Sequence, residues 1–440
     1  MDMDITPIMI DEFSKNYNSN KQNKIIENSI VENGLQKACI DHQVVKENPL
    51  VFSIELPEGK RYNQRDNSKC WIYSGLNFIK YNIADNLKMD LKELELSNSF
   101  IAFFDKLEKS NNVYENIIQL DQTDWGYINN EEILKYCVDE GGHWQWFMAV
   151  VDKYGLVPYS QMPDSYESLQ PEELTRLFAD KVKGDCLKLI IAKNNHNLAT
   201  LRKIKKTFLQ ENYEFLAKSL GEPKQLFDYE YKNKDGKLVA YDDITPLEFR
   251  RKFLTIRLKD FVSIGNLPMY NKKYYEVYRK KHLGNVHGKS CVDFLNLPID
   301  ELKDLAIRQL KDGTPVYMGI DIKKFKSREY GILDKRLYDY RDSLGLNFLA
   351  KDEALNMQDI FPHHRMTLCG VNLTAKGKPN RWKVEDSYGN ERGINGYYVM
   401  NDNYFNDFVI QIIINKKYLT KRQNNALKQK PIEFNIRDPF

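Results

Sequence analysis

The 440-residue sequence lacks an apolar run long enough to cross a membrane. The longest candidate, FVIQIII at residues 408–414, is about a third of the roughly 20 residues that a spanning helix needs, and it predicts a buried strand. An excess of one charge is also missing, because the formal net charge is only +3. This balance requires neither nucleic acid nor a membrane as a partner. The acidic start MDMDITPIMIDEF does not resemble a secretory signal, so we expect a cytoplasmic protein.

Cysteine is scarce and irregularly spaced. The six cysteines lie at positions 39, 70, 137, 186, 291 and 369, and no two of them form a CxxC pair. This spacing argues against a zinc site and against a disulfide framework, so we expect most of the thiols to be reduced and buried. Cys137 and Cys369 lie in apolar runs and are expected to be structural. We expect no metal ion and no other cofactor.

The composition supplies enough apolar material for a substantial core. Hydrophobic residues make up 42% of the chain and charged residues 29%, as in folded globular proteins. The length would allow about three domains of roughly 150 residues, but a large single unit also reaches this size.

Helix and strand patterns are separated along the chain, which predicts an α+β fold with a cleft where the two parts meet. We expect one unit over residues 1–440. Within it the pattern predicts an N-terminal segment (1–60) with a helical stretch on the body, a helical part (61–150), a helical insertion (155–290), a β part (291–425) and a C-terminal arm (426–440). We expect the insertion to take part in oligomerisation. The β part contains TPVYMGIDI, HRMTLCGVNL, RWKVED, GYYVM and FVIQIII, which predict a largely antiparallel sheet.

Residues 63–74, NQRDNSKCWIYS, place a cysteine where a polar loop becomes an apolar helix. Asn67 or Ser68 can cap this helix, which puts Cys70 in its first turn. The positive end of a helix stabilises a thiolate, and acyl transfer also needs hydrogen-bond donors for the developing oxyanion. The side-chain amide of Gln64 and the backbone N–H of Cys70 would supply two. A lone cysteine in an apolar helix is more often a packing residue, so its neighbours decide the interpretation.

Gln64, followed after five residues by Cys70 and Trp71, resembles the active-site loop of papain-like cysteine peptidases. Such a peptidase needs a histidine and then Asn or Asp further along the chain. His364 opens the strand HRMTLCGV, and Asp386 closes the strand RWKVED, so the two can lie side by side. His363 is the only rival among the seven histidines, and the His-x-Met spacing from His364 to Met366 matches the family.

The separation of Cys70 from His364 is about twice the roughly 130 to 150 residues of the compact papain type. A particular branch is indicated by YNQRDNSKCW, LSNSFIAFFDKLE, EGGHWQW, VDKYGLVP, QLKDGTPVYMGID, RWKVEDSYG, GYYVM and PIEFNIRDPF. These stretches resemble the bleomycin hydrolase and aminopeptidase C family, over about residues 10 to 440.

The resemblance implies a papain-like fold with inserted helices, a cytosolic aminopeptidase of broad specificity, and a homohexameric ring with its active sites facing an internal chamber. It implies Cys70 as nucleophile, His364 as general base and acid, Asp386 as the residue that orients the imidazole, and Gln64 as oxyanion donor. It also matches Gly141 and Gly142 to a stretch that lines the substrate backbone. The substrates would be peptides.

Four features depart from the family pattern. Asp386 stands where Asn is usual, Tyr388 where Trp is usual, and Arg365 replaces a small residue after the histidine. Arg365 would either face solvent or narrow the cleft and recognise an acidic group. The fourth departure is that the sequence stops at Phe440, where the family continues for a few small residues. We therefore expect an open cleft with Phe440 in an apolar subsite, and cleavage of internal peptide bonds rather than only of N-terminal ones.

Two other functions stay open at this point. One is a broad-specificity aminopeptidase with the same mechanism. The other is a ring-shaped binding protein, for example for nucleic acid, whose catalysis is vestigial because of Asp386 and Tyr388. The basic stretches RKIKK (202–206) and KKFK (323–326) are more typical of solvated surfaces than of nucleic-acid sites.

Overall fold

The computed structural model describes residues 4–120, 133–134, 137–280, 283–289 and 291–434. Among these residues, no helix has the length and apolar character needed to cross a membrane. The stretch around FVIQIII forms a buried strand, as its sequence predicts.

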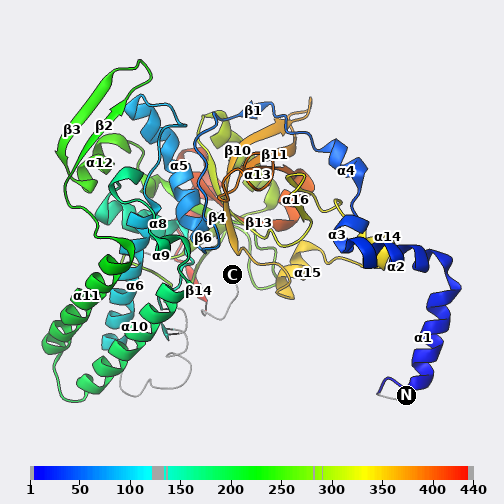
Figure 1. The fold of residues 1–440 in the computed structure, drawn as a ribbon, viewed down its shortest axis with the longest axis horizontal. Helices are drawn as coiled ribbons and strands as arrows, with labels where there is room; N and C mark the ends of the chain where they lie inside the picture. The colour runs from blue at the N-terminus through cyan, green and yellow to red at the C-terminus, as the bar shows by residue number, and fades with distance from the viewer. Residues whose placement is uncertain (1–3, 121–132, 135–136, 281–282, 290, 435–440) are drawn as a thin grey trace.

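The helices of the described residues fall mainly in the first half of the chain (Figure 1). They are α1 (Pro7–Ser19), α2 (Lys21–Asn33), α3 (Leu35–Ala38), α4 (His42–Glu47), α5 (Cys70–Leu87), α6 (Asn98–Gln119), α8 (Trp144–Tyr154), α9 (Tyr166–Leu169), α10 (Glu172–Lys193), α11 (Leu198–Leu220), α12 (Pro246–Phe253), α13 (Ile299–Lys311), α14 (Tyr340–Leu344), α15 (Lys351–Asn356), α16 (Asp402–Phe408) and α17 (Lys421–Leu427).

The strands are β1 (Ile54–Glu55), β2 (Phe227–Lys232), β3 (Leu238–Ile244), β4 (Phe261–Gly265), β5 (Val277–Lys280), β6 (Asp293–Asn296), β7 (Val316–Ile320), β8 (Lys326–Ser327), β9 (Ile332–Leu333), β10 (His364–Leu373), β11 (Pro379–Glu385), β12 (Tyr397–Asn401), β13 (Val409–Asn415) and β14 (Ile432–Phe434). Within the described residues, 12 strands form one sheet in the order β14-β5-β6-β4-β13-β7-β10-β11-β12-β9-β8, and β1 pairs with β10. The expected strands of the β part are all present, and the central pairs are antiparallel.

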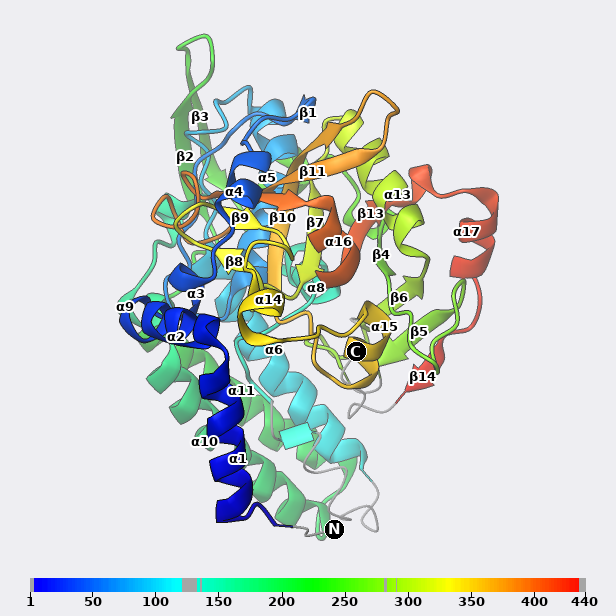
Figure 2. The same cartoon turned by 90° about the vertical axis from the view of Figure 1, so that its right-hand side faces the viewer.

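Strand β10 lies at the centre of this sheet, between β7 and β11. Its first eight residues are all buried, because α5 packs against it and α13 also contacts it. Met366, Leu368, Cys369 and Val371 supply its apolar packing, while His364 and Arg365 open the strand and line the cleft. Figure 2 shows β10 and its neighbours beside α5.

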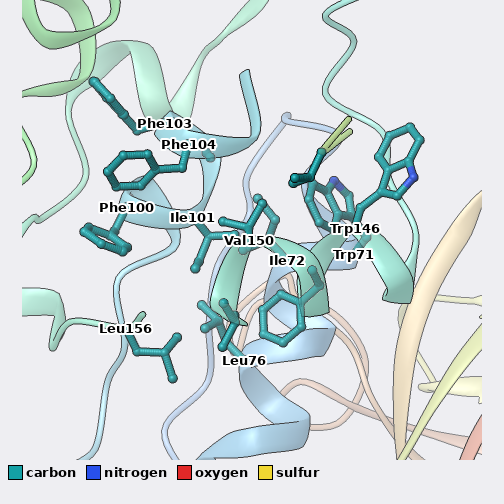
Figure 3. Packing of buried hydrophobic residues seen from close by; sticks show 14 of the residues in the cluster. Trp71, Ile72, Leu76, Phe100, Ile101, Phe103, Phe104, Trp146, Val150 and Leu156 are labelled. Carbon is teal, nitrogen blue, oxygen red and sulfur yellow. The ribbon is translucent and has the colours of Figure 1, made fainter. Parts of the chain in front are cut away.

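Helix α5 is the central element of the helical part. Residues 70–80 are all buried, so this helix has no solvent-facing stripe in its first three turns. Ile72 and Leu76 pack with side chains of α6 and α8, including Ile101 and Val150 (Figure 3).

A buried ion pair joins α5 to the sheet. The Nζ of Lys80 lies 2.9 Å from Oε1 of Glu385, and both side chains are fully buried. Lys80 also donates to Asn77 Oδ1 and to the Lys60 carbonyl oxygen. This buried ion pair holds α5 against β11, because losing one partner would leave a buried charge unpaired. The helix that begins at Cys70 is thereby fixed to the strand that ends beside Asp386.

Two expectations about the arrangement are wrong in part. The helical N-terminal stretch does not all lie on the body: neither α1 nor α2 has a buried residue, and α1 projects away from the rest of the molecule (Figure 1). Among the described residues of 155–290, the α-helices are α9, α10, α11 and α12. The second half of this stretch also forms the β2–β3 hairpin and adds β4 and β5 to the main sheet. The alternation in FDYEYK is a strand pattern that the high content of charged residues and tyrosine hides.

Candidate active site

Cys70 is the first residue of α5, as its position after the polar loop predicts. The expected capping is different, however. Lys69 is the N-cap residue and makes no side-chain cap, while Asn67 accepts from the backbone N–H of Lys69 at 3.0 Å and so shapes the loop before the helix. Cys70 is 8% exposed and lines a cleft.

The surroundings of Cys70 favour ionisation of its thiol. Burial alone would raise its pKa, but the charge of His364 and a hydrogen bond with His364 lower it below the usual value for cysteine. The charge and the backbone N–H of Arg365 act in the same direction. A thiolate is the reactive form of cysteine, so Cys70 combines access to the cleft with nucleophilic character.

His364 and Asp386 lie at adjacent ends of β10 and β11. Nε2 of His364 lies 2.8 Å from Oδ1 of Asp386, whose side chain is fully buried. This contact leaves Nδ1 as the ring nitrogen for Cys70. Burial would lower the pKa of His364, but Asp386 and Cys70 raise it to about 9. Burial would raise the pKa of Asp386, yet His364, Lys326 and the backbone N–H of Ser387 keep it below its usual value.

The structure brings His364, and not His363, to Cys70. His363 is partly exposed, and its Nδ1 lies 2.9 Å from the Phe361 carbonyl oxygen and 3.7 Å from Oδ1 of Asp321. The ring of Tyr388 instead stacks on His364, with centroids 5.9 Å apart and an interplanar angle of 20°. Arg392 in turn covers Tyr388, with Cζ 3.6 Å from the ring centroid. The ring of Tyr388 therefore covers one side of the His364 imidazole, which contacts Asp386.

Gln64 is buried next to this pair. Its Nε2 donates to the Asn67 carbonyl oxygen at 2.6 Å, and its Oε1 accepts from the hydroxyl of Ser387. An amide nitrogen carries two hydrogens, so one remains for a ligand in the cleft that Gln64 lines. The orientation is fixed because Ser387 holds the oxygen end of the amide.

Ser387 is the residue that the sequence analysis missed. Its backbone N–H donates to Oδ1 of Asp386 at 2.9 Å, and its carbonyl oxygen accepts from the backbone N–H of Gln64 at 2.6 Å. Together with its hydroxyl, these bonds connect Asp386 to Gln64. The only sequence signal for this role is its place directly after Asp386.

Gly141 and Gly142 also line the cleft, but they differ in their surroundings. A Cβ at Gly142 would lie 2.4 Å from the Trp71 ring, whereas a Cβ at Gly141 would meet nothing within 4 Å. The Nε1 of Trp71 donates to the Glu140 carbonyl oxygen at 2.7 Å, and its ring packs edge-on against Trp146 (Figure 3). Phe440 lies outside the described residues.

The cleft has a volume of ≈ 1310 Å³ and receives residues from both halves of the molecule. Its described lining contains more cations than anions. The cationic residues are Lys37, Lys109, Lys280, Lys323, Lys326, Arg328, Arg365 and Arg392, against Asp139 and Glu329. In the described part of the chain, no group of three or more His, Cys, Asp or Glu side chains could hold a metal ion. Cys70, His364 and Gln64 all line this cleft, an arrangement that can place a thiolate, an imidazole and an amide N–H around one bound carbonyl group.

Comparison with known proteins agrees with this geometry. Residues 4–440 match the Peptidase C1-like family. The chain is 32% identical over 445 residues to aminopeptidase C of Listeria monocytogenes, covering 100% of this chain and 99% of that protein. It is 35% identical over 419 residues to aminopeptidase C of Streptococcus thermophilus, covering 94% and 93%.

A solved structure is similar throughout. The crystal structure of PepW from Lactobacillus rhamnosis has a TM-score of 0.95 and 34% identity, and the match covers 100% of this chain and 99% of that chain. The fold is therefore papain-like, as the resemblance of the Cys70 loop implies. The chain belongs to the Peptidase C1-like family, in the bleomycin hydrolase and aminopeptidase C branch of the cysteine peptidases.

Proposed function

We propose that this chain hydrolyses oligopeptides through an acyl-enzyme on Cys70. The observation that carries the proposal is the position of His364, which contacts Asp386 through Nε2 at 2.8 Å and is hydrogen-bonded to the Cys70 thiol at the start of a helix. The raised pKa of His364 and the lowered pKa of Cys70 favour a thiolate–imidazolium pair before substrate binds.

In the first step the Cys70 thiolate attacks the carbonyl carbon of the cleaved bond. The carbonyl oxygen takes the negative charge and accepts hydrogen bonds from the free N–H of Gln64 and the backbone N–H of Cys70. His364 gives its proton to the leaving nitrogen, which departs as an amine, and a thioester on Cys70 remains. Neutral His364 then removes a proton from water, the resulting hydroxide attacks the thioester, and the acid product leaves. The thiolate and imidazolium are restored.

The position of the cleaved bond separates two proposals. The similar proteins named aminopeptidases support removal of N-terminal residues. Cleavage of internal bonds has no comparable support among these relatives and stays a prediction. The basic stretch 202–206 gives little support to nucleic-acid binding, because Arg202 and Lys205 both contact the carboxylate of Glu115.

A pair of peptides tests the proposed reaction. One peptide has a free amino terminus and the other is the same peptide N-acetylated, and products are identified by mass spectrometry with Cys70→Ala as the control. We expect cleavage of the free peptide by the native chain and none by Cys70→Ala. Stepwise release of single residues only from the free peptide would support an aminopeptidase, and cleavage of the acetylated peptide would support internal cleavage. Absence of turnover on both would refute the peptidase proposal.

We also propose that the chain acts as a homohexamer in the cytoplasm. Exposed apolar side chains on α1, such as Ile8 and Phe13, support contacts between copies, because an isolated helix that buries nothing gains little from the fold of its own chain. All six cysteines are free, which suits a reducing compartment.

A further inference from the structure

Arg365 is a buried cation that forms no ion pair with a carboxylate of the described residues. It follows His364 in β10 and is only 7% exposed. Its Nη1 donates to the backbone carbonyl oxygens of Pro362 and His364, the latter at 3.1 Å. Its Nε has no hydrogen-bond partner, and no carboxylate of the described residues forms an ion pair with it. A buried charge that no carboxylate neutralises is costly, so the retention of Arg365 beside the active site suggests an anionic ligand in addition to the Cys70 thiolate.

The sheet leaves space for the guanidinium of Arg365 above a glycine. Arg365 pairs with Gly319, Gly319 pairs with Gln411, and Gln411 pairs with Gly265, so the four residues form a row across β10, β7, β13 and β4. Directly paired residues share a face of the sheet. A Cβ on Gly319 would lie 3.5 Å from Cζ of Arg365 and 3.3 Å from Oε1 of Gln411. The absence of a side chain at this glycine gives the guanidinium its space.

The space occupied by the guanidinium opens into the cleft at Cys70. Arg365, Gln411 and Gly265 all line the cleft that contains Cys70. The positive charge of Arg365 lowers the pKa of Cys70 and the pKa of His143, which directly follows Gly141 and Gly142. Because cations outnumber anions along the described lining, the cleft also attracts anionic ligands from solution.

We propose that Arg365 forms an anion-binding subsite which selects peptides that carry an Asp or Glu side chain within two residues of the cleaved bond. The inference rests on the proposed peptidase function and adds a specificity-determining residue to it. A carboxylate in the cleft would pair with the guanidinium charge, and a charge-assisted hydrogen bond inside a partly desolvated cleft is stronger than one in water. The matching amide of a Gln side chain has the same shape but no charge.

The test compares peptides that differ only by Glu or Gln at one of the two positions on either side of the cleaved bond. All are amidated at the carboxyl terminus, so that the side chain supplies the only carboxylate. We expect kcat/KM to favour Glu at one position by about 10-fold to 100-fold, the range of a charged hydrogen bond. The ratio should fall close to one in Arg365→Ala. It should be intermediate in Arg365→Lys, which keeps the charge but loses the planar fork of donors.

The control variant Arg176→Ala removes the same charge from an exposed site on α10 and should keep the native ratio. Cleavage of the Gln peptide by Arg365→Ala, together with alkylation of Cys70, shows that the variant is folded. If Arg365→Ala does not fold, the ratio of kcat/KM for the Glu and Gln peptides in the native chain and in Arg365→Lys still tests the subsite. Equal cleavage of Glu and Gln peptides by the native chain, or an unchanged preference in Arg365→Ala, would overturn the subsite. Failure of the native chain to cleave any peptide would instead refute the peptidase function itself.

Discussion

Gln64 and Asp386 are held in place by one serine, so the proposed oxyanion donor and the residue proposed to orient the base share the same hydrogen-bonding partner. Ser387 accepts from the Gln64 backbone, donates its hydroxyl to the Gln64 side chain, and donates its backbone N–H to Asp386. A donor fixed before the reaction costs no reorganisation when negative charge develops on the substrate.

The first prediction concerns Gln64. Gln64→Ala should lower kcat by roughly 10²-fold to 10³-fold, because a preorganised oxyanion donor acts mainly in the transition state. The neighbouring exposed residue supplies a control, Arg65→Ala, which should change kcat little. Steady-state kinetics on one peptide measure both variants. A higher KM with kcat unchanged would show that Gln64 only binds the ground state.

The second prediction concerns the charge of Asp386. Asp386→Asn keeps an acceptor for the imidazole N–H, so it should retain substantial activity near pH 6, while Asp386→Ala should lose more. The charge of Asp386 helps to raise the pKa of His364 to about 9, so activity of the native chain should decline as pH rises through that value. In Asp386→Asn the decline should begin at lower pH, toward the ordinary histidine value of about 6.5.

Profiles of kcat/KM against pH measure this effect. An alkaline limb at the same pH in the native chain and Asp386→Asn would show that the carboxylate charge does not set the titration of His364. Near-complete and equal loss in both variants at every pH would mean that the charge itself is required for turnover.

Single residues of the site differ in how well the sequence predicts them. The structure brings together Cys70, His364, Asp386 and Gln64, whose residue types are constrained by the chemistry of acyl transfer. Ser387 acts only because the chain at Tyr62–Gln64 approaches the chain that follows Asp386, and this approach depends on tertiary structure. The prediction of a side-chain cap from Asn67 or Ser68 is wrong for a local reason, since the Asn67 side chain accepts from the backbone N–H of Lys69 within the loop.

At the scale of elements, Trp71 at the start of α5 packs against Gly142, which lies in the chain just before α8. The third prediction depends on this contact. Gly142→Ala should destabilise the site, because its Cβ would lie within 2.4 Å of a ring that is packed against Trp146 and cannot move freely. Overpacking of this kind costs about 1 to 3 kcal/mol. Gly141→Ala is the matched control and should be tolerated, because its Cβ would meet nothing within 4 Å.

Denaturant unfolding and peptide turnover measure the two glycine variants side by side. We expect a lower unfolding midpoint and lower turnover for Gly142→Ala, with Gly141→Ala close to the native chain in stability. Equal stability and turnover of the two variants would contradict the account of how Trp71 is seated.

The elements themselves were predictable where periodicity is strong. Strands β7, β10 and β13 are buried along most of their length, and their short runs of mainly apolar and β-branched or aromatic residues indicate strands. The β2–β3 hairpin was missed because most of its side chains are polar or exposed, and strands β8 and β9 have two residues each. Elements of that kind are defined by their partners rather than by their own sequence.

At the scale of the whole molecule, α1 buries no residue against its own chain. The fourth prediction is that it contributes to assembly. The native mass should be six times the 51.9 kDa of one chain, and the double substitution Ile8→Asp with Phe13→Asp should lower it, because both side chains are exposed and apolar. Lys15→Ala on the same helix is the control. Light scattering that gives 51.9 kDa for the native chain would refute the assembly.

The central claim is that Cys70 is the nucleophile, and alkylation with an iodoacetamide-type reagent tests it most directly. Cys291 is exposed and would also react, so the measurement uses a Cys291→Ser background and follows labelling by peptide mapping alongside peptide cleavage. We predict one label per chain, on Cys70, with cleavage lost in proportion to labelling, because the lowered pKa makes this thiol more reactive than the buried ones. Cleavage that continues after Cys70 is fully alkylated would contradict the account.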